Sequence, residues 1–308
     1  MQHWLHAFRL RTLPLAVSSI IVGSALAYKQ SRLVADGPDW RIVTGLAVLT
    51  AILLQVLSNL ANDLGDHQHG TDNKDRVGPQ RAVQSGAISP AAMKRGMIVC
   101  GVLALLSGCA LITVALGLTI TTLIFFLLGL AAIVAAVKYT FGKNPYGYAG
   151  LGDVSVFLFF GPVGVCGTYF LHTHTISAAS VLLGIAFGFM CAGVLNLNNM
   201  RDIENDRASG KRTLVVRIGS KRAKRYHYFL MVAALFALVA APWSYLFDET
   251  GHHGIPIWPA LTYMGLIGNH LRKVDSITEP AKFDSQLKPL ALSTFFTALA
   301  LSLGIILA

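Results

Sequence analysis

The sequence predicts an all-α integral membrane protein, a bundle of nine transmembrane helices that form a single domain over residues 1–308. Of the 308 residues, 54% are hydrophobic and only 13% are charged, whereas a soluble domain carries about 25% charged residues. The mean hydropathy is +0.58. Apolar runs near the length of a bilayer-spanning helix recur along the chain, and they leave no room for a separate soluble domain.

Nine apolar segments account for the predicted bundle. They cover residues 13–28, 42–60, 97–116, 119–137, 152–171, 180–197, 228–247, 255–268 and 290–308. The first follows a basic start and imitates a secretory signal, but we interpret it as a span because similar runs continue downstream. The eighth is the weakest, since it is short for a span and Pro256 and Pro259 would kink it.

Positive charge is concentrated in alternate loops. If the N-terminus is cytoplasmic, nine spans place 22 of the 25 Lys and Arg residues on the cytoplasmic face and leave Lys29, Arg32 and Arg41 outside. Basic residues collect in cytoplasmic loops of membrane proteins. The sequence therefore predicts that the N-terminus and both long polar loops are cytoplasmic and that the C-terminus lies outside.

Two other classes of partner or site are not indicated. The net charge of +10 is accounted for by the cytoplasmic loops, so we expect the lipid bilayer, and no nucleic acid, as a partner. The four cysteines lie in apolar runs without a CxxC pair, which is typical of small buried side chains and not of disulfides or a metal site.

The first polar segment whose residues could take part in binding or catalysis follows the second span. In NLANDLGDHQHG, Asn59 and Asp63 are four residues apart, as are Asn62 and Asp66. A helical continuation would cluster these two amides and two carboxylates. Glycine and proline then break the helix, and later charged residues can fold back toward it: Asp72, Asp75 and Arg81.

The second polar segment repeats this design after the sixth span. Asn198, Asp202 and Asp206 recur every four residues, and Gly210 and Lys211 follow. If the helix continues, the three oxygen-bearing side chains stack on one face. Two such segments on one side of a membrane suit Mg²⁺, which binds through a few carboxylates and substrate phosphates.

The charge of these segments indicates a diphosphate clamp. Facing carboxylates at a membrane interface repel each other unless cations lie between them. Basic side chains could offset the remaining charge of a diphosphate with its Mg²⁺: Arg81, Lys138 and Lys211. Alternatively, each segment is a solvated loop with helix-capping residues, but two segments with the same spacing on one face favour the clamp.

A third polar region lies between the fourth and fifth spans. Tyr139 is a candidate for holding the diphosphate. Asp153 begins the fifth span, where it could cap the helix, orient a substrate hydroxyl or take a proton. All three roles of Asp153 remain open.

The motifs resemble a known family. The pair NDLGD and RDIEND resembles the two aspartate-rich motifs of the UbiA superfamily of intramembrane prenyltransferases. The segments RTLPLA, NLANDLGDHQHGTDNKDRVGPQR, NPYGYAGLGD and NLNNMRDIENDRASGKRTLVVRIG resemble its 1,4-dihydroxy-2-naphthoate polyprenyltransferase branch, in order and through most of the chain. Where the superfamily commonly has a further aspartate, this sequence has Gly70, so either Asp72 or Asp75 could assist the metal.

The resemblance implies a fold, a reaction and a location. The nine helices would surround a central cavity in the bacterial cytoplasmic (inner) membrane, with Mg²⁺ and a polyprenyl diphosphate between the aspartate segments. The prenyl chain would pass to 1,4-dihydroxy-2-naphthoate with loss of CO₂, giving demethylmenaquinone. Spacing and resemblance together give the metal and catalytic candidates Asp63, Asp66, Asp202 and Asp206, with Asp153 as a further catalytic candidate. They give the substrate-binding candidates Asn59, Asn62, Arg81, Lys138, Tyr139, Asn198 and Lys211.

Three alternatives are weighed against this function. Within the superfamily, 4-hydroxybenzoate, homogentisate and chlorophyllide are rival acceptors. A multi-pass transporter could use intramembrane carboxylates, but these would be expected near the bilayer midplane and not at the ends of spans. A scaffold without catalysis would not need the paired amide and carboxylate spacing.

Overall fold

The computed structural model describes residues 2–31, 39–74, 76–246 and 254–308, and it has no strand within these ranges. Three residues that enter the sequence analysis, Arg32, Asp75 and residue 247, lie outside the described residues. The all-α class is confirmed. The protein is a multi-pass helical bundle of the kind that spans a membrane.

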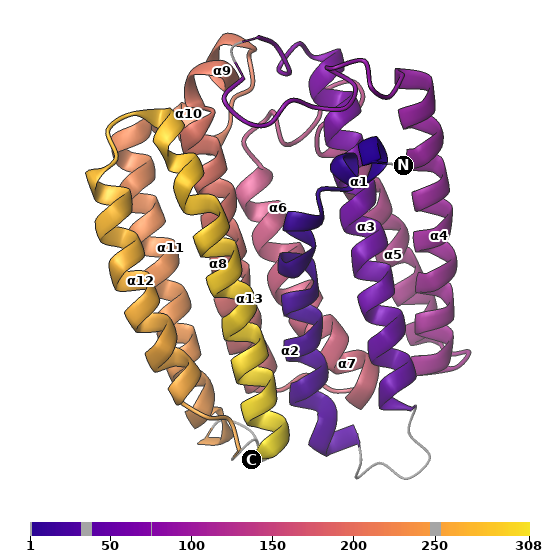
Figure 1. Cartoon of the computed structure of the whole chain (residues 1–308). Helices are drawn as coiled ribbons and strands as arrows, with labels where there is room; N and C mark the ends of the chain where they lie inside the picture. The colour runs from indigo at the N-terminus through magenta and orange to yellow at the C-terminus, as the bar shows by residue number, and fades with distance from the viewer. Residues whose placement is uncertain (1, 32–38, 75, 247–253) are drawn as a thin grey trace.

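Long helices run side by side along the bundle (Figure 1). They are α2 (Leu13–Ser31), α3 (Trp40–Gln68), α4 (Pro90–Leu116), α5 (Ile120–Lys138), α8 (Ala178–Arg201), α11 (Ser220–Ala240), α12 (Trp258–Ser276) and α13 (Asp284–Leu307). A further crossing consists of α6 (Gly152–Leu158), η2 (Phe159–Gly167) and α7 (Thr168–Thr173). The short elements are α1 (Gln2–Phe8), η1 (Leu10–Thr12), α9 (Ile203–Ala208), α10 (Leu214–Ile218), η3 (Ala241–Leu246) and η4 (Pro280–Phe283).

The predicted number of spans is one too high by length and composition. Among the described residues, eight helical stretches are long and apolar enough to cross a membrane. The eighth predicted segment, 255–268, overlaps the first half of α12. This helix does not qualify because its last turns carry charged side chains such as Arg272, Lys273 and Asp275. Nevertheless α12 runs beside α11 and α13 for most of their length, and the two chain ends lie at opposite ends of the bundle (Figure 1).

The crossing from α6 to α7 is irregular for a local reason. Pro162 lies inside it and has no N–H to donate, and the backbone around it widens into the π-helical η2. Gly161 allows this wide stretch to pack directly on α8, because a Cβ there would collide with the carbonyl oxygen of Gly184.

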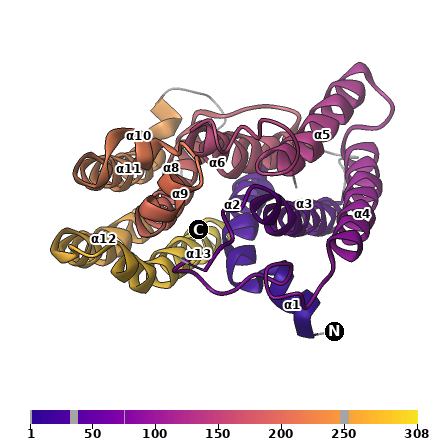
Figure 2. The ribbon, with the colours of Figure 1, turned by 90° about the horizontal axis from the view of Figure 1, so that it is seen from above.

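The interior is divided between two main apolar clusters. One joins α2, η2, α8 and α11 to α13, with Tyr169, Phe187 and Tyr263 fully buried. The other joins α1, α3 and α4 around Leu60 and Met93. Seen from above, the first group lies at one side of the molecule and α3 to α5 at the other (Figure 2). The two aspartate segments belong to different groups, α3 and α8–α9, and lie at the same end of the bundle (Figure 1).

Candidate active site

The first aspartate of the α3 segment holds a loop. Asp63 is buried, and its Oδ2 and Oδ1 accept hydrogen bonds from the backbone N–H groups of Ala82 and Val83, both at 3.1 Å. The turn that follows Arg81 is thereby fixed to the end of α3. A carboxylate has about four lone-pair sites, so Asp63 retains acceptor capacity after these two bonds.

The second aspartate of α3 faces another part of the chain. Asp66 lies one turn further and is buried. Its Oδ1 accepts a hydrogen bond from the hydroxyl of Tyr148 at 2.9 Å, and that hydroxyl also lies 2.6 Å from Oγ1 of Thr71. Gly65 allows the loop after α5 to approach here, because a Cβ at Gly65 would lie 2.5 Å from the carbonyl oxygen of Thr140.

The second segment is nearly one continuous helix, as its spacing predicts. Helix α8 ends at Arg201, and Asp202 connects it to α9. The backbone N–H of Asp202 still donates to the carbonyl of Asn198 at 3.1 Å, and that of Asp206 donates to Asp202 at 2.8 Å. The i to i+4 pattern therefore continues across the junction.

Asp202 is bound by a buried arginine. The Arg201 Nη2 and Nε donate to its two carboxylate oxygens at 2.6 and 2.8 Å. The same guanidinium donates to Asn198 Oδ1 at 2.9 Å and to Asp284 Oδ1, at the start of α13, at 2.7 Å. Arg201 therefore connects the second aspartate segment to α13.

Lys211 lies between the two segments. Its Nζ is 3.6 Å from Asp66 Oδ1 and 3.8 Å from Asp206 Oδ1, and 5.1 Å from the centre of the Tyr148 ring. Burial lowers the pKa of Lys211, but the carboxylates of Asp66 and Asp206 together raise it by more than burial lowers it. The pKa of Lys211 is therefore above its ordinary value. Burial raises the pKa of Asp206 to about 6, although the Lys211 ammonium opposes this shift.

A third carboxylate adjoins the first segment. Asp72 Oδ1 pairs with Arg76 Nη1 at 2.7 Å and lies 3.8 Å from Arg81 Nε. Its Oδ2 is buried without a hydrogen-bond partner among the described residues. Burial, followed by the charge of Asp66, raises the pKa of Asp72 to about 7. Of the two later aspartates that could assist a metal, Asp72 thus lies beside the site, and Asp75 is outside the described residues.

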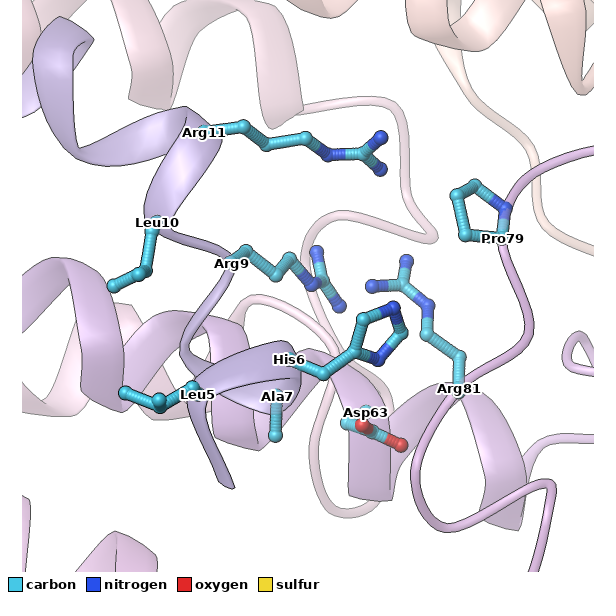
Figure 3. Close-up of a pocket in the computed structure, with 9 residues that line it drawn as sticks. All are labelled: Leu5, His6, Ala7, Arg9, Leu10, Arg11, Asp63, Pro79 and Arg81. Atoms are coloured by element: carbon cyan, nitrogen blue, oxygen red, sulfur yellow. The ribbon is translucent and has the colours of Figure 1, made fainter. Parts of the chain in front are cut away.

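A basic cavity opens above Asp63. It has a volume of about 420 Å³ and is lined by α1, η1 and the loop at Pro79–Arg81. In Figure 3 the guanidinium groups of Arg9, Arg11 and Arg81 converge on it, with Asp63 beneath them. Arg9 has a φ of 51°, a conformation that is uncommon for a residue other than glycine and typical of functional sites.

The predicted amides act mainly as positioning groups. Asn59 Nδ2 donates to the carbonyl of Phe8 at 2.9 Å and to Thr12 Oγ1 at 3.1 Å, so it fixes the N-terminal segment that carries Arg9. Asn62 Oδ1 accepts from Thr140 Oγ1 at 2.7 Å. These three bonds hold neighbouring segments against the end of α3.

The remaining candidates lie further from this cluster. Tyr139 is next to the start of α6, because a Cβ at Gly152 would lie 2.7 Å from its hydroxyl. Burial raises the pKa of Tyr139, and the carboxylate of Asp153 adds to the shift. Asp153 hydrogen-bonds with Tyr226 and has its Oδ1 buried without a partner among the described residues. Lys138 is exposed at the end of α5, so the structure does not bring it to the aspartates.

The donor set fits Mg²⁺. Carboxylate oxygens from both segments meet around Lys211. In the described part of the chain, no three His, Cys, Asp or Glu side chains are close enough to hold a metal by themselves. Mg²⁺ does not require such a cage, since it commonly binds through one or two carboxylates together with substrate phosphates and water. Asp66, Asp206 and the unpaired Oδ2 of Asp72 could provide that protein share.

Several residues of the site were missed from sequence. Arg201 is directly adjacent to Asp202, which could have indicated an ion pair, but its second partner, Asp284, is 83 residues away. Arg9 and Arg11 belong to the basic start of the chain, which the distribution of Lys and Arg assigned to the cytoplasmic face without indicating a role in the site. The contact of Tyr148 with Asp66 also depends on the folded chain.

Comparisons with known proteins agree with the geometry. Residues 16–299 match the UbiA prenyltransferase family. The chain is 42% identical over 306 residues to an Escherichia coli protein named 1,4-dihydroxy-2-naphthoate octaprenyltransferase, covering 99% of this chain and 96% of that protein. It is 35% identical over 244 residues to a Mycobacterium tuberculosis protein of the same name, covering 78% and 79%.

Solved structures share the fold. A UbiA homologue from Aeropyrum pernix K1 has a TM-score of 0.68 at 16% identity, covering 97% of this chain and 98% of its own. A UbiA homologue from Archaeoglobus fulgidus, bound to GPP and Mg²⁺, has a TM-score of 0.64 at 17% identity, covering 98% and 100%. At these identities the likeness establishes the architecture alone.

Proposed function

Because the chain belongs to the UbiA prenyltransferase family, we propose that it is a Mg²⁺-dependent 1,4-dihydroxy-2-naphthoate polyprenyltransferase. The observation that carries this proposal is the position of Lys211 between Asp66 and Asp206. Through these contacts the two aspartate segments meet at one end of the bundle. The names of the relatives at 42% and 35% identity support the naphthoate acceptor.

The residues around the aspartates divide the work of binding a diphosphate. Asp66, Asp206 and the unpaired Oδ2 of Asp72 would hold Mg²⁺. Asp63 and Asp202, one turn away from Asp66 and Asp206, would supply further oxygens. Bound Mg²⁺ acts as a Lewis acid that stabilises charge on the leaving diphosphate. The guanidinium groups of the basic cavity supply planar donors that match phosphate oxygens: Arg9, Arg11 and Arg81. Lys211 adds an ammonium between Asp66 and Asp206.

The reaction balances without another reactant. The allylic C–O bond breaks, and its electron pair leaves with the diphosphate. A C–C bond forms between the allylic carbon and the ring carbon that carries the carboxylate. The carboxylate departs as CO₂, and its bonding electrons restore the aromatic ring, giving demethylmenaquinol, the reduced form of demethylmenaquinone. The apolar interior excludes water that would trap the allylic cation.

The remaining candidates have roles that follow from their positions. Asn59 and Asn62 would hold the N-terminal segment and the Thr140 loop in place, and Asn198 would orient Arg201. Asp153 and Tyr139, beside each other at the start of α6, would face the aromatic acceptor. Lys138 is exposed at the end of α5, and we assign it no part in binding the diphosphate.

Orientation follows from the face on which the site lies. The aspartate segments and the basic loops share the end of the bundle that holds the N-terminus (Figure 1). Since basic loops remain in the cytoplasm, we place the active site on the cytoplasmic side of the bacterial inner membrane. The carboxylates lie at the ends of α3 and α8, unlike the midplane sites of transporters.

A product assay tests the function. Membranes that contain the protein are incubated with a labelled polyprenyl diphosphate, Mg²⁺ and 1,4-dihydroxy-2-naphthoate, 4-hydroxybenzoate or homogentisate in turn. We expect a prenylated, decarboxylated product from the naphthoate alone, and none after chelation of Mg²⁺. A product from another acid would reassign the acceptor, and no transfer to any acid would refute the proposed activity.

A further inference from the structure

A second cavity lies away from the aspartate segments. It has a volume of about 710 Å³ and lies between the start of α11 and the end of α12. These two helices form an outer edge of the molecule (Figure 2). The cavity shares no residue with the basic cavity above Asp63, so the proposed transfer reaction does not account for it.

The lining of this second cavity is strongly basic. Lys221, Lys224 and Arg225 line it from the first two turns of α11, and Asp275 is the one carboxylate among its lining residues. Lys221 and Arg225 are exposed, and no hydrogen bond or ion pair of either side chain is described within the ranges that the structure covers. Both therefore have charges available for an anion.

The wall of the cavity is held in place by bonds between helices. Lys224 Nζ donates to the carbonyl oxygens of Asp275 at 2.8 Å and Ile277 at 2.6 Å, at the end of α12. One turn further along α11, the Tyr228 hydroxyl donates to the carbonyl of Leu271 at 3.2 Å. These bonds fix the spacing of the two helices and thereby the backbone positions from which Lys221 and Arg225 extend.

An exposed apolar surface begins next to the cavity. On α11, the residues that follow Tyr228 include Phe229 and Phe236, whose side chains are 58% and 70% exposed, and Val232. These residues lie in a stretch that is long and apolar enough to cross a membrane. The cavity thus lies where the polar end of α11 meets its lipid-facing surface, which is the depth of phospholipid headgroups.

We propose that the cavity between α11 and α12 binds the phosphate headgroup of an anionic phospholipid from the leaflet that faces the active site. Lys221 and Arg225 would neutralise the phosphate, and the acyl chains would lie along Phe229 and Phe236. Basic pockets between helices at the cytoplasmic surface suit such headgroups. A free phosphate would gain nothing from the adjoining apolar surface.

Lipid titration of purified full-length protein tests the proposal. Lys221→Gln with Arg225→Gln removes the two free cations. The matched control, Lys94→Gln with Arg95→Gln, removes two exposed cations at the start of α4 on the same membrane face. Binding of phosphatidylglycerol and phosphatidylcholine to protein in neutral detergent is measured by native mass spectrometry.

The lost charges should weaken phosphatidylglycerol binding by about 30-fold, given about 1 kcal/mol for each basic residue near a membrane surface, and the control should bind like wild type. The exchanged pair Lys221→Arg with Arg225→Lys should retain binding, which would separate a charge effect from misfolding. Transfer activity in phosphatidylcholine should not change with any pair, so this result stands independently of the proposed function. Equal losses in the α4 control, or equal competition by inorganic phosphate at the concentration of the lipid, would overturn the proposal.

Discussion

The two aspartate segments use the same residue type in different surroundings. Asp63 on α3 is held by two uncharged backbone N–H groups, whereas Asp202 at the end of α8 is held by the guanidinium of Arg201. The other aspartate of each segment, Asp66 or Asp206, faces Lys211. Each segment thus has one carboxylate that organises its own half of the protein and one that faces the other half.

We call Asp63 and Asp202 the anchoring carboxylates, because each holds neighbouring chain in place, and Asp66 and Asp206 the bridging carboxylates, because both face Lys211. Loss of a bridging carboxylate should mainly remove transfer, because Asp66 and Asp206 face the proposed metal and diphosphate. Loss of an anchoring carboxylate should also lower stability. The two anchoring carboxylates should lower stability for different reasons. Loss of Asp202 breaks a buried charge pair and leaves the charge of Arg201 without this partner, whereas loss of Asp63 leaves unpaired backbone donors.

Replacing a bridging aspartate should have the largest effect. We expect Asp66→Ala and Asp206→Ala each to lower the transfer rate on the order of 10³-fold, because about 4 kcal/mol of charge stabilisation would be lost. The measurement is transfer from a labelled prenyl diphosphate at saturating Mg²⁺. Glu204→Ala is the control, since that exposed carboxylate pairs only with Arg207 at 3.0 Å among the described contacts. Near-normal transfer by either bridging variant would contradict the assignment.

Replacing Arg201, which holds Asp202, should have the second largest effect on transfer. Arg201→Gln removes the charged partner of both Asp202 and Asp284, so Asp202 loses its orientation. We expect the Mg²⁺ concentration for half-maximal transfer to rise by about 10- to 100-fold, as is typical when a residue that orients a metal ligand is lost. Arg207→Gln, in the exposed pair, should leave it unchanged. An unaltered Mg²⁺ dependence in Arg201→Gln would show that Asp202 needs no such anchor.

Replacing Asp63, which is held by uncharged backbone groups, should lower the stability of the protein. Asp63→Asn leaves one backbone N–H of the Ala82–Val83 turn facing an amide group, at a cost of about 1–3 kcal/mol. The metal-free protein should therefore unfold at a lower temperature in detergent. Asp66→Asn serves as the comparison, because its amide oxygen can still accept from Tyr148, and its unfolding temperature should change less. Equal shifts in the two variants would remove the distinction between anchor and bridge.

The pH dependence of Mg²⁺ binding should show the smallest effect. The pKa of Asp206 is raised by burial to about 6, so the contribution of this group to stability of the metal-free protein is largest below its ordinary pKa and is lost as pH rises through about 6. Mg²⁺ needs the ionised form. Its affinity should therefore rise several-fold between about pH 5 and pH 7, as measured by calorimetric titration, and an affinity independent of pH would contradict the burial of this carboxylate.

Sequence predicted the parts of this molecule that depend on local patterns. Apolar runs and the distribution of Lys and Arg gave the bundle and the common face of the two segments, and four-residue spacing placed Asp202 and Asp206 on one helical path. The error in span number arose at α12, where charged residues share a helix with a short apolar run.

Partners that are distant in sequence could not be predicted. Asp63 meets the turn at Val83, Asp66 meets Tyr148, and Arg201 meets Asp284. These contacts arise only when helices from both halves pack together. Spacing therefore identified the carboxylates but could not show which of them anchor the structure and which of them face the other segment.

A double-mutant cycle shows whether Asp66 and Asp206 hold one shared Mg²⁺–diphosphate unit. The measurement is Mg²⁺-dependent binding of a prenyl diphosphate to purified wild-type protein, Asp66→Asn, Asp206→Asn and the double variant. If both carboxylates hold one Mg²⁺–diphosphate unit, the double variant should bind no more weakly than the weaker single variant, since either change already breaks the unit. Additive losses of binding free energy would show that the two segments act independently and do not share one Mg²⁺–diphosphate unit.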